Sequence, residues 1–303
     1  MQLYMQPKSE GAQRLQSFQV ATTPRAGLQA YTDHFGNAVY HFDVPGTHQE
    51  LQVEVEAEVE TYATPAPPEW VDSSTWNVLE ALRQKGEHFD MIEAHGVARV
   101  TPALTAFLEE RALSKTSDPM TTLRKLNRTI FDAFAYSPEE TDVDSPIDVA
   151  LGKRKGVCQD FAHIMIATAR QWGIPTRYVS GYLFTKREAG DRSAADATHA
   201  WVESFIPGTG WVGFDPTNNV LAGERHIRVA IGRDYDDVPP ARGVFKGPAN
   251  SELAVAVSVT PAQSPRRRDD FLRVVRSTSK SVQRQGLATS DTQQQQQQST
   301  FDR

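Results

Sequence analysis

The chain has 303 residues, a formal net charge of −6 and 39% hydrophobic residues, a composition typical of a globular protein. The acidic balance argues against a nucleic-acid partner, because a nucleic-acid-binding face needs clustered positive charge. A single cysteine cannot form an internal disulfide, the first residues lack the pattern of a signal peptide, and no apolar run approaches the roughly 20 residues that span a bilayer. We therefore expect a cytoplasmic protein with no membrane partner, whose oligomeric state the sequence leaves open.

Residues 1–65 have the pattern of a small N-terminal β domain. "DHFGNAVYHFDV" (33–44) places a Gly-Asn pair beside an aromatic and β-branched run and predicts a hairpin. "LQVEVEAEVETY" (51–62) alternates valine with glutamate, which predicts a half-buried strand. We interpret the glutamate row as a solvated face rather than as an acidic docking surface.

Proline-rich "TPAPPEW" (64–70) ends this pattern, and we assign 66–100 to a linker and connecting segment. A core domain is predicted over 101–262, where helices begin at three polar residues that each precede a proline. These pairs are Thr101–Pro102, Asp118–Pro119 and Ser145–Pro146. The glutamine-rich end, 263–303, cannot bury a core and is predicted to be disordered.

The segment "GVCQDFAHIMIATARQWGIP" (156–175) predicts a central helix that begins near Cys158 and ends before Gly173. "TRYVSGYLF" (176–184) predicts a buried strand, and polar "TKREAGDRSAADAT" (185–198) predicts a mobile loop. Two hairpin strands follow, "HAWVESFI" (199–206) and "WVGFDPT" (211–217), and "SELAVAVSVT" (251–260) alternates like another strand.

The position of Cys158 allows two interpretations. A lone cysteine is commonly a small buried hydrophobe. At a helix N-terminus, however, unpaired N–H groups and the helix dipole favour thiolate over thiol, as a nucleophile requires. Gly156 would then leave room for a substrate backbone near the sulfur, and the Cys158 N–H would be a donor to a developing oxyanion.

A cysteine nucleophile needs a base and an orienting group, and His199 and Asp215 are the candidates. A hairpin centred on Pro207 would place these two residues directly opposite each other, on the face that also carries Trp201. A tight turn at Gly208-Thr209 would instead move Asp215 to the other face. The arrangement therefore requires a wider loop centred near Pro207, or a bulge.

Several neighbouring residues are candidates for the substrate cleft. Trp201 and Trp211 either wall the cleft or belong to the hairpin core, and Tyr182 either faces the cleft or packs inside. Gln159 could donate an amide hydrogen to the oxyanion or simply pack on the helix surface. The histidines show no metal-ligand spacing, so we expect neither a metal nor an organic cofactor.

Three blocks together resemble one family. "KGVCQDFAHIMIATARQWGIPTRYVSGYL", "THAWVESFIPGTGWVGFDPTNN" and "DYDDVPPARGVFKG" are similar to the core of bacterial transglutaminase-like proteins, over roughly residues 100–260. "DHFGNAVYHF" resembles the small β domain that precedes this core, although the family usually begins with a longer first strand. The resemblance implies a papain-like fold with Cys158 as nucleophile, His199 as general base and acid, and Asp215 as the orienting group.

The expected architecture is α+β, with a cysteine-bearing helix on an antiparallel sheet and a small N-terminal β domain. The expected chemistry is acyl transfer on the amide bonds of a peptide or protein substrate, through a thioester. Hydrolysis is preferred, because the polar loop 185–198 should admit water to the cleft. The alternatives are a cross-linking transglutaminase, which transfers the acyl group to a lysine amine, and a catalytically silent peptide-binding module.

Overall fold

The computed structural model describes residues 1–93, 96–138, 140–142, 144–185, 190–193, 197–244, 246 and 254–262. The helices are α1 (Thr75–Gln84), α2 (Phe89–Ile92), α3 (Pro102–Glu110), α4 (Pro119–Ala133), α5 (Ile147–Lys153) and α6 (Cys158–Gln171). The strands of the first half are β1 (Gln2–Leu3), β2 (Gln13–Thr23), β3 (Gln29–Thr32), β4 (Ala38–His41), β5 (Gln52–Thr61), β6 (Ala135–Tyr136) and β7 (Lys155–Gly156). Those of the second half are β8 (Thr176–Leu183), β9 (His199–Ile206), β10 (Gly210–Asp215), β11 (Val220–Leu221), β12 (His226–Gly232) and β13 (Ala241–Arg242).

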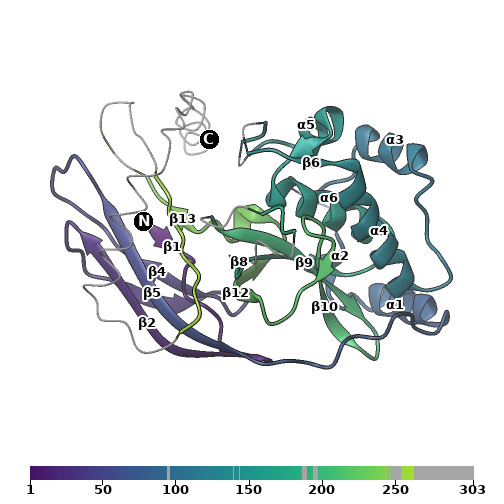
Figure 1. The fold of residues 1–303 in the computed structure, drawn as a ribbon, viewed down its shortest axis with the longest axis horizontal. Coiled ribbons are helices and arrows are strands. Elements are labelled where there is room, and N and C mark those ends of the chain that lie inside the picture. Colours follow the sequence, from purple (N-terminus) through teal and green to yellow (C-terminus); the bar gives the residue numbers. More distant parts are fainter. Residues whose placement is uncertain are drawn as a thin grey trace.

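The N-terminal strands form two small sheets at one end of the molecule (Figure 1). One has the order β13-β1-β4-β3 and contains the predicted hairpin as β3 and β4; the other is the long ribbon β2-β5. β13, which lies within the predicted core domain, thus pairs with β1. The strand predicted over 51–62 is found as β5, but the alternation of its residues does not extend to their burial: its valines are partly buried, and its glutamates are partly buried or exposed. A two-stranded ribbon has a single neighbour strand and covers neither face completely.

The helix starts follow the local capping pattern. Thr101 Oγ1 accepts a hydrogen bond from the backbone N–H of Leu104 at 3.2 Å, and Asp118 Oδ1 accepts one from that of Thr121 at 2.9 Å. The third start differs in detail, because α5 begins after the proline and Ser145 Oγ instead accepts from a backbone N–H in the preceding turn. The segment assigned to a linker and connection, 66–100, also contains α1 and α2.

The central layer is a five-stranded antiparallel sheet with the order β11-β10-β9-β8-β12. Helix α6 packs against β8 and β9, and the other helices of the core lie on the side away from the N-terminal strands (Figure 1). Residues 159–170 of α6 are all buried, so the helix is enclosed rather than amphipathic. Gly173, with a φ of +80°, terminates it as predicted.

The N-terminal region covers the outer edge of β12 with side-chain amides. Asn37 accepts from Ile231 N–H at 2.9 Å and donates to its carbonyl at 2.8 Å, and Gln13 makes the same pair of contacts with Arg228 at 2.8 and 2.9 Å. These amides satisfy backbone groups that an unpaired edge strand would leave open.

The strand predicted over 251–260 is not found where the structure describes it. Residues 254–262 have no regular structure and are mostly exposed, while 251–253 lie outside the described residues. Alternation of side chains predicts the two faces of a strand but supplies no partner for its backbone hydrogen bonds, and no strand forms over 254–260. The predicted disordered end, 263–303, lies outside the described residues. In the part of the chain that is described, no helix is long and apolar enough to cross a membrane.

Candidate active site

Helix α6 places Cys158 at its first position, with the side chain partly exposed. The carboxylate of Asp160 fixes this helix start: its Oδ2 accepts from Val157 N–H at 2.8 Å and from Thr141 Oγ1 at 2.7 Å. Unpaired N–H groups and the positive end of the helix dipole therefore lie beside the sulfur.

The role expected for Gly156 is corrected by the packing. A Cβ atom built on this residue would lie 2.6 Å from Asp160 Oδ2, which is closer than real atoms approach. The space beside Gly156 thus belongs to the capping carboxylate, and the residue is itself buried. Its lack of a side chain serves the helix start rather than leaving room for a substrate backbone.

The hairpin that carries His199 and Asp215 has a different register from the predicted one. Ile206 pairs with Gly210 and Val202 with Phe214, so the loop is centred on Gly208 and not on Pro207. A shift of two residues keeps side chains on the same face, whereas a shift of one would have reversed them. His199 and Asp215 are therefore diagonal neighbours rather than directly opposed, and the long imidazole side chain spans the gap.

The structure brings the two side chains into direct contact. His199 Nε2 lies 2.8 Å from Asp215 Oδ2, and the two residues are 3% and 0% exposed. Asp215 Oδ1 also accepts from the backbone N–H groups of Thr217 and Asn218, at 2.9 and 3.2 Å. Burial alone would raise the pKa of Asp215, but the charge and hydrogen bond of His199 and the hydrogen bond of His226 hold it well below its usual range.

The same contact decides the charge of the imidazole. Burial alone would lower the pKa of His199, but the Asp215 charge and hydrogen bond, together with Cys158, raise it to about 10. Cys158 is a hydrogen-bonding neighbour of His199, and since Nε2 faces Asp215, Nδ1 is the nitrogen available to the sulfur. The arrangement favours an imidazolium beside the cysteine.

A second histidine completes the surroundings of Asp215. His226 Nε2 lies 3.2 Å from Asp215 Oδ2, and its Nδ1 accepts from the backbone N–H of Gly223 at 3.2 Å. That backbone donor requires an unprotonated Nδ1, so Nε2 carries the hydrogen and donates it to Asp215. His199, Asp215 and His226 have the composition of a metal site, but the protonated Nε2 and the crowded Oδ2 do not suit a metal ion.

The family models match both halves of the chain. The model of the transglutaminase-like superfamily matches residues 107–216, which contain Cys158, His199 and Asp215. The model of the bacterial transglutaminase-like N-terminal region matches residues 1–60. An uncharacterized protein of Mycobacterium leprae is 32% identical over 255 residues, which cover 84% of this chain and 89% of that protein. The chain belongs to the transglutaminase-like superfamily.

Two further comparisons concern part of the sequence and the fold of this transglutaminase-like protein. A protein-glutamine gamma-glutamyltransferase of Pseudomonas aeruginosa is 36% identical over 106 residues, which are 31% of this chain and 15% of that protein. The crystal structure of a provisionally assigned cysteine protease from Cytophaga hutchinsonii has a TM-score of 0.59 at 21% identity, over 87% of this chain and 86% of that one. The fold is shared, and the predicted family and the α+β architecture are confirmed.

The three aromatic candidates for the cleft differ in their distance from His199 in this transglutaminase-like core. The ring of Trp201 stacks on the His199 imidazole, with the ring centroids 6.0 Å apart. Trp201 is 1% exposed and packs with Val179 and Ile231, so it belongs to the core. The Arg177 guanidinium lies over the ring of Trp211, 4.2 Å from the ring centroid. Trp211 stands near the start of β10, whereas Asp215 ends that strand. Tyr182 is partly buried against the main core, where burial raises its pKa to about 12.

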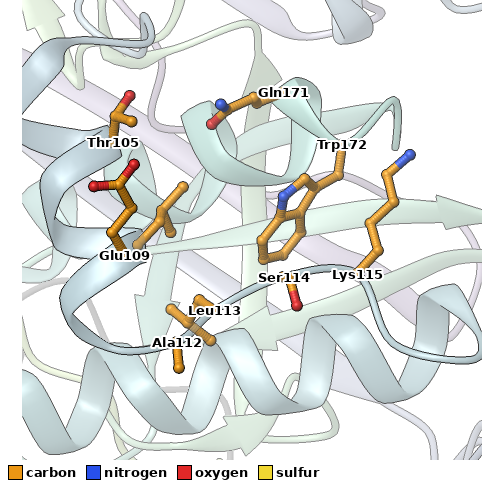
Figure 2. A pocket seen from close by; sticks show the side chains of 9 residues that line it. Thr105, Glu109, Ala112, Leu113, Ser114, Lys115, Gln171 and Trp172 are labelled. Carbon is orange, nitrogen blue, oxygen red and sulfur yellow. The ribbon is translucent and has the colours of Figure 1, made fainter.

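Gln159 is buried in the first turn of α6, directly after Cys158. A surface hollow lies at the C-terminal end of the same helix, the opposite end from the cysteine, where Gln171 and Trp172 line it together with Leu113 (Figure 2). The position of this hollow gives it no part in chemistry at Cys158.

Sequence reasoning missed three residues around the pair, namely Ser193, Asn218 and His226. Asn218 donates to Asp215 Oδ2 at 2.7 Å and to Ser193 Oγ at 2.9 Å. The run Asp215-Pro-Thr-Asn218 carries a usable signal, because an aspartate often caps backbone N–H groups two or three residues ahead. His226 has no such signal, since only the pairing of β12 with β8 brings it near.

Proposed function

We propose that this protein catalyses acyl transfer on amide bonds through a thioester formed at Cys158. The observation that supports this most directly is the buried contact of His199 with Asp215, at 2.8 Å, beside a partly exposed cysteine at a helix N-terminus. A nucleophile, a base within reach and a group that orients the base are the elements of covalent acyl transfer.

In the first half-reaction the Cys158 thiolate attacks the amide carbonyl carbon. The carbon–nitrogen bond breaks, the leaving amine takes the proton from His199 Nδ1, and the acyl group remains on sulfur as a thioester. In this mechanism the backbone N–H of Cys158, at the start of α6, donates to the developing oxyanion. Asp215 keeps the imidazole oriented and stabilises its charge.

We propose hydrolysis as the second half-reaction. Water then gives a proton to His199 and attacks the thioester carbon; the carbon–sulfur bond breaks, a carboxylic acid is released, and the thiolate–imidazolium pair is restored. The polar hydroxyl of Ser193 lies 3.3 Å from His199, in a loop whose described residues are polar, and a polar neighbour of the imidazole favours access of water over exclusion of it. A peptidase or amidase activity is the result.

Transamidation is the second candidate. It is favoured by the match to the Pseudomonas gamma-glutamyltransferase, although that match spans 15% of the relative. The thioester is common to both reactions, and only the second nucleophile differs.

The test is to incubate the protein with a glutamine-containing peptide library, with and without a primary amine at millimolar concentration, and to identify products by mass. Cleaved or deamidated peptides support hydrolysis, whereas a majority of amine adducts supports transamidation. Cys158→Ser is the matched control and should abolish both products. Binding of peptides without any product would indicate a silent binding module and would contradict the proposal.

A further inference from the structure

Hydrogen bonds form a closed ring around the His199 imidazole. His199 Nε2 contacts Asp215 Oδ2 at 2.8 Å, and the Asn218 amide donates to that same oxygen at 2.7 Å. The Asn218 amide also donates to Ser193 Oγ at 2.9 Å, and Ser193 Oγ in turn lies 3.3 Å from His199 Nδ1. The imidazole is therefore held at both nitrogens, once by the carboxylate and once by a hydroxyl.

The residues before Ser193 fix its position. Arg192 N–H donates to Asn218 Oδ1 at 2.8 Å, and its guanidinium stacks 3.5 Å from the centre of the Phe131 ring. Asp191 forms an ion pair with Arg225 at 2.6 Å, with an aspartate side chain that is 5% exposed. Residues 190–193 thus contact the end of α4 and the turn after β11. These contacts hold Ser193 beside His199.

The Ser193 hydroxyl lies beside Nδ1 of His199, the nitrogen that would accept and donate the proton in acid–base catalysis. A charged imidazole donates from Nδ1, and Ser193 Oγ can share that hydrogen with the Cys158 sulfur, because a hydroxyl has two lone pairs, of which Asn218 uses one. A neutral imidazole would instead accept a hydrogen from the Ser193 hydroxyl. The Asp215 carboxylate, 2.8 Å from Nε2, favours the imidazolium and so the arrangement in which Ser193 is the acceptor. The charged and titratable groups that face the imidazole are Cys158 from α6, Asp215 from β10 and His226 from β12.

We propose that Ser193, oriented by Asn218, is a positioning residue that accepts a hydrogen bond from Nδ1 of the His199 imidazolium and so stabilises the thiolate–imidazolium pair. The inference rests on the proposed function, since it takes Cys158 as the nucleophile. It makes residues 190–193 a part of the active site rather than a simple connection.

Alkylation of the single cysteine tests this without a known substrate. The rate of iodoacetamide labelling, followed by mass against pH, reports the thiolate of Cys158 alone. Ser193→Ala should move the pH midpoint upward by about 0.5 to 1 unit, the range expected for loss of one longish hydrogen bond to a charged group. Ser193→Thr keeps the hydroxyl and should retain the wild-type midpoint, and Asn218→Ala should shift it in the same direction as Ser193→Ala.

Ser204→Ala is the matched control. Its hydroxyl is buried on β9 and bonds Thr176 at 2.9 Å, so the variant loses a serine hydrogen bond without touching His199. Circular dichroism at each pH ensures that only folded protein is compared. A Ser193→Ala profile that coincides with the wild type overturns the inference while leaving the proposed function intact. A wild-type midpoint near 8.5, that of an ordinary thiol, contradicts the proposed function itself.

Discussion

Asp215→Asn is the most informative single change at this site. The substitution keeps the shape of the side chain but removes its charge. At the Oδ2 position an amide nitrogen would face donors from His199, His226 and Asn218, and at the Oδ1 position it would face two backbone N–H groups. Either orientation therefore leaves buried donors pointing at a donor, which costs about 1–3 kcal/mol for each group left unpaired.

The charge on His199 sets the size of the effect that Asp215→Asn should have on the reactivity of Cys158. Its pKa is raised from 6.5 to about 10, and each pKa unit corresponds to 1.36 kcal/mol, so the folded protein favours the imidazolium by on the order of 5 kcal/mol. Without the carboxylate, burial dominates and the imidazole should be neutral at pH 7. We expect the rate of iodoacetamide labelling at pH 6 to fall at least about tenfold, because the thiolate loses its cationic partner.

The pH dependence of stability checks the same reasoning. The His199 contribution is fully present below pH 6.5 and is lost as the pH rises through about 10; the Asp215 contribution is present above about pH 3.8 and is lost as the pH falls. The free energy of unfolding of the wild type should therefore exceed that of Asp215→Asn most between about pH 4 and 6.5. The difference should shrink toward pH 10.

Asp118→Asn is a suitable control, since it also neutralises a buried aspartate but leaves a residue that caps α4 well. Its labelling profile should match that of the wild type. If Asp215→Asn labels with the wild-type profile, the carboxylate does not charge His199 and the reasoning fails.

Three further changes test other parts of the structure. His163 is 1% exposed and burial lowers its pKa to about 3, so His163→Gln should weaken the loss of stability between pH 6.5 and 3 in acid unfolding; an unchanged acid limb would contradict this. Asn37→Ala unpairs both backbone groups of Ile231 and should cost about 2–4 kcal/mol in urea unfolding, whereas a loss below about 0.5 kcal/mol would show that the amide does not cover the edge. Gly156→Ala displaces the Asp160 carboxylate and should lower the melting temperature by several degrees, a shift that differential scanning calorimetry would detect or exclude.

Local structure in this protein follows closely from local sequence. Thr101 and Asp118 cap their helices because a side-chain oxygen reaches N–H groups only three residues ahead. The cysteine-bearing helix and its end at Gly173 follow in the same way from periodicity and from one residue with a positive φ. Such interactions involve few residues, so their energies are nearly independent of the rest of the fold.

The hairpin shows where this reasoning reaches its limit. Equal arms about Pro207 predicted His199 opposite Asp215, but the loop is centred on Gly208. Both centres leave the two side chains on one face, which is why the pair meets despite the error in register. Turn geometry decided the register, while the alternation along each strand decided the face.

Other features depend on competition between distant segments. The alternating residues 254–260 form no strand, because alternation within a segment cannot supply the partner strand that its backbone hydrogen bonds need. The second histidine on Asp215 and the hydroxyl on His199 come from parts of the chain with no recognisable spacing. The sequence by itself determined the helix starts, the faces of the strands and the types of residue at the site. Only the tertiary structure decided which groups surround the His199 imidazole. Each polar atom forms few hydrogen bonds, and the folding of distant segments determines which donors and acceptors come within reach of it.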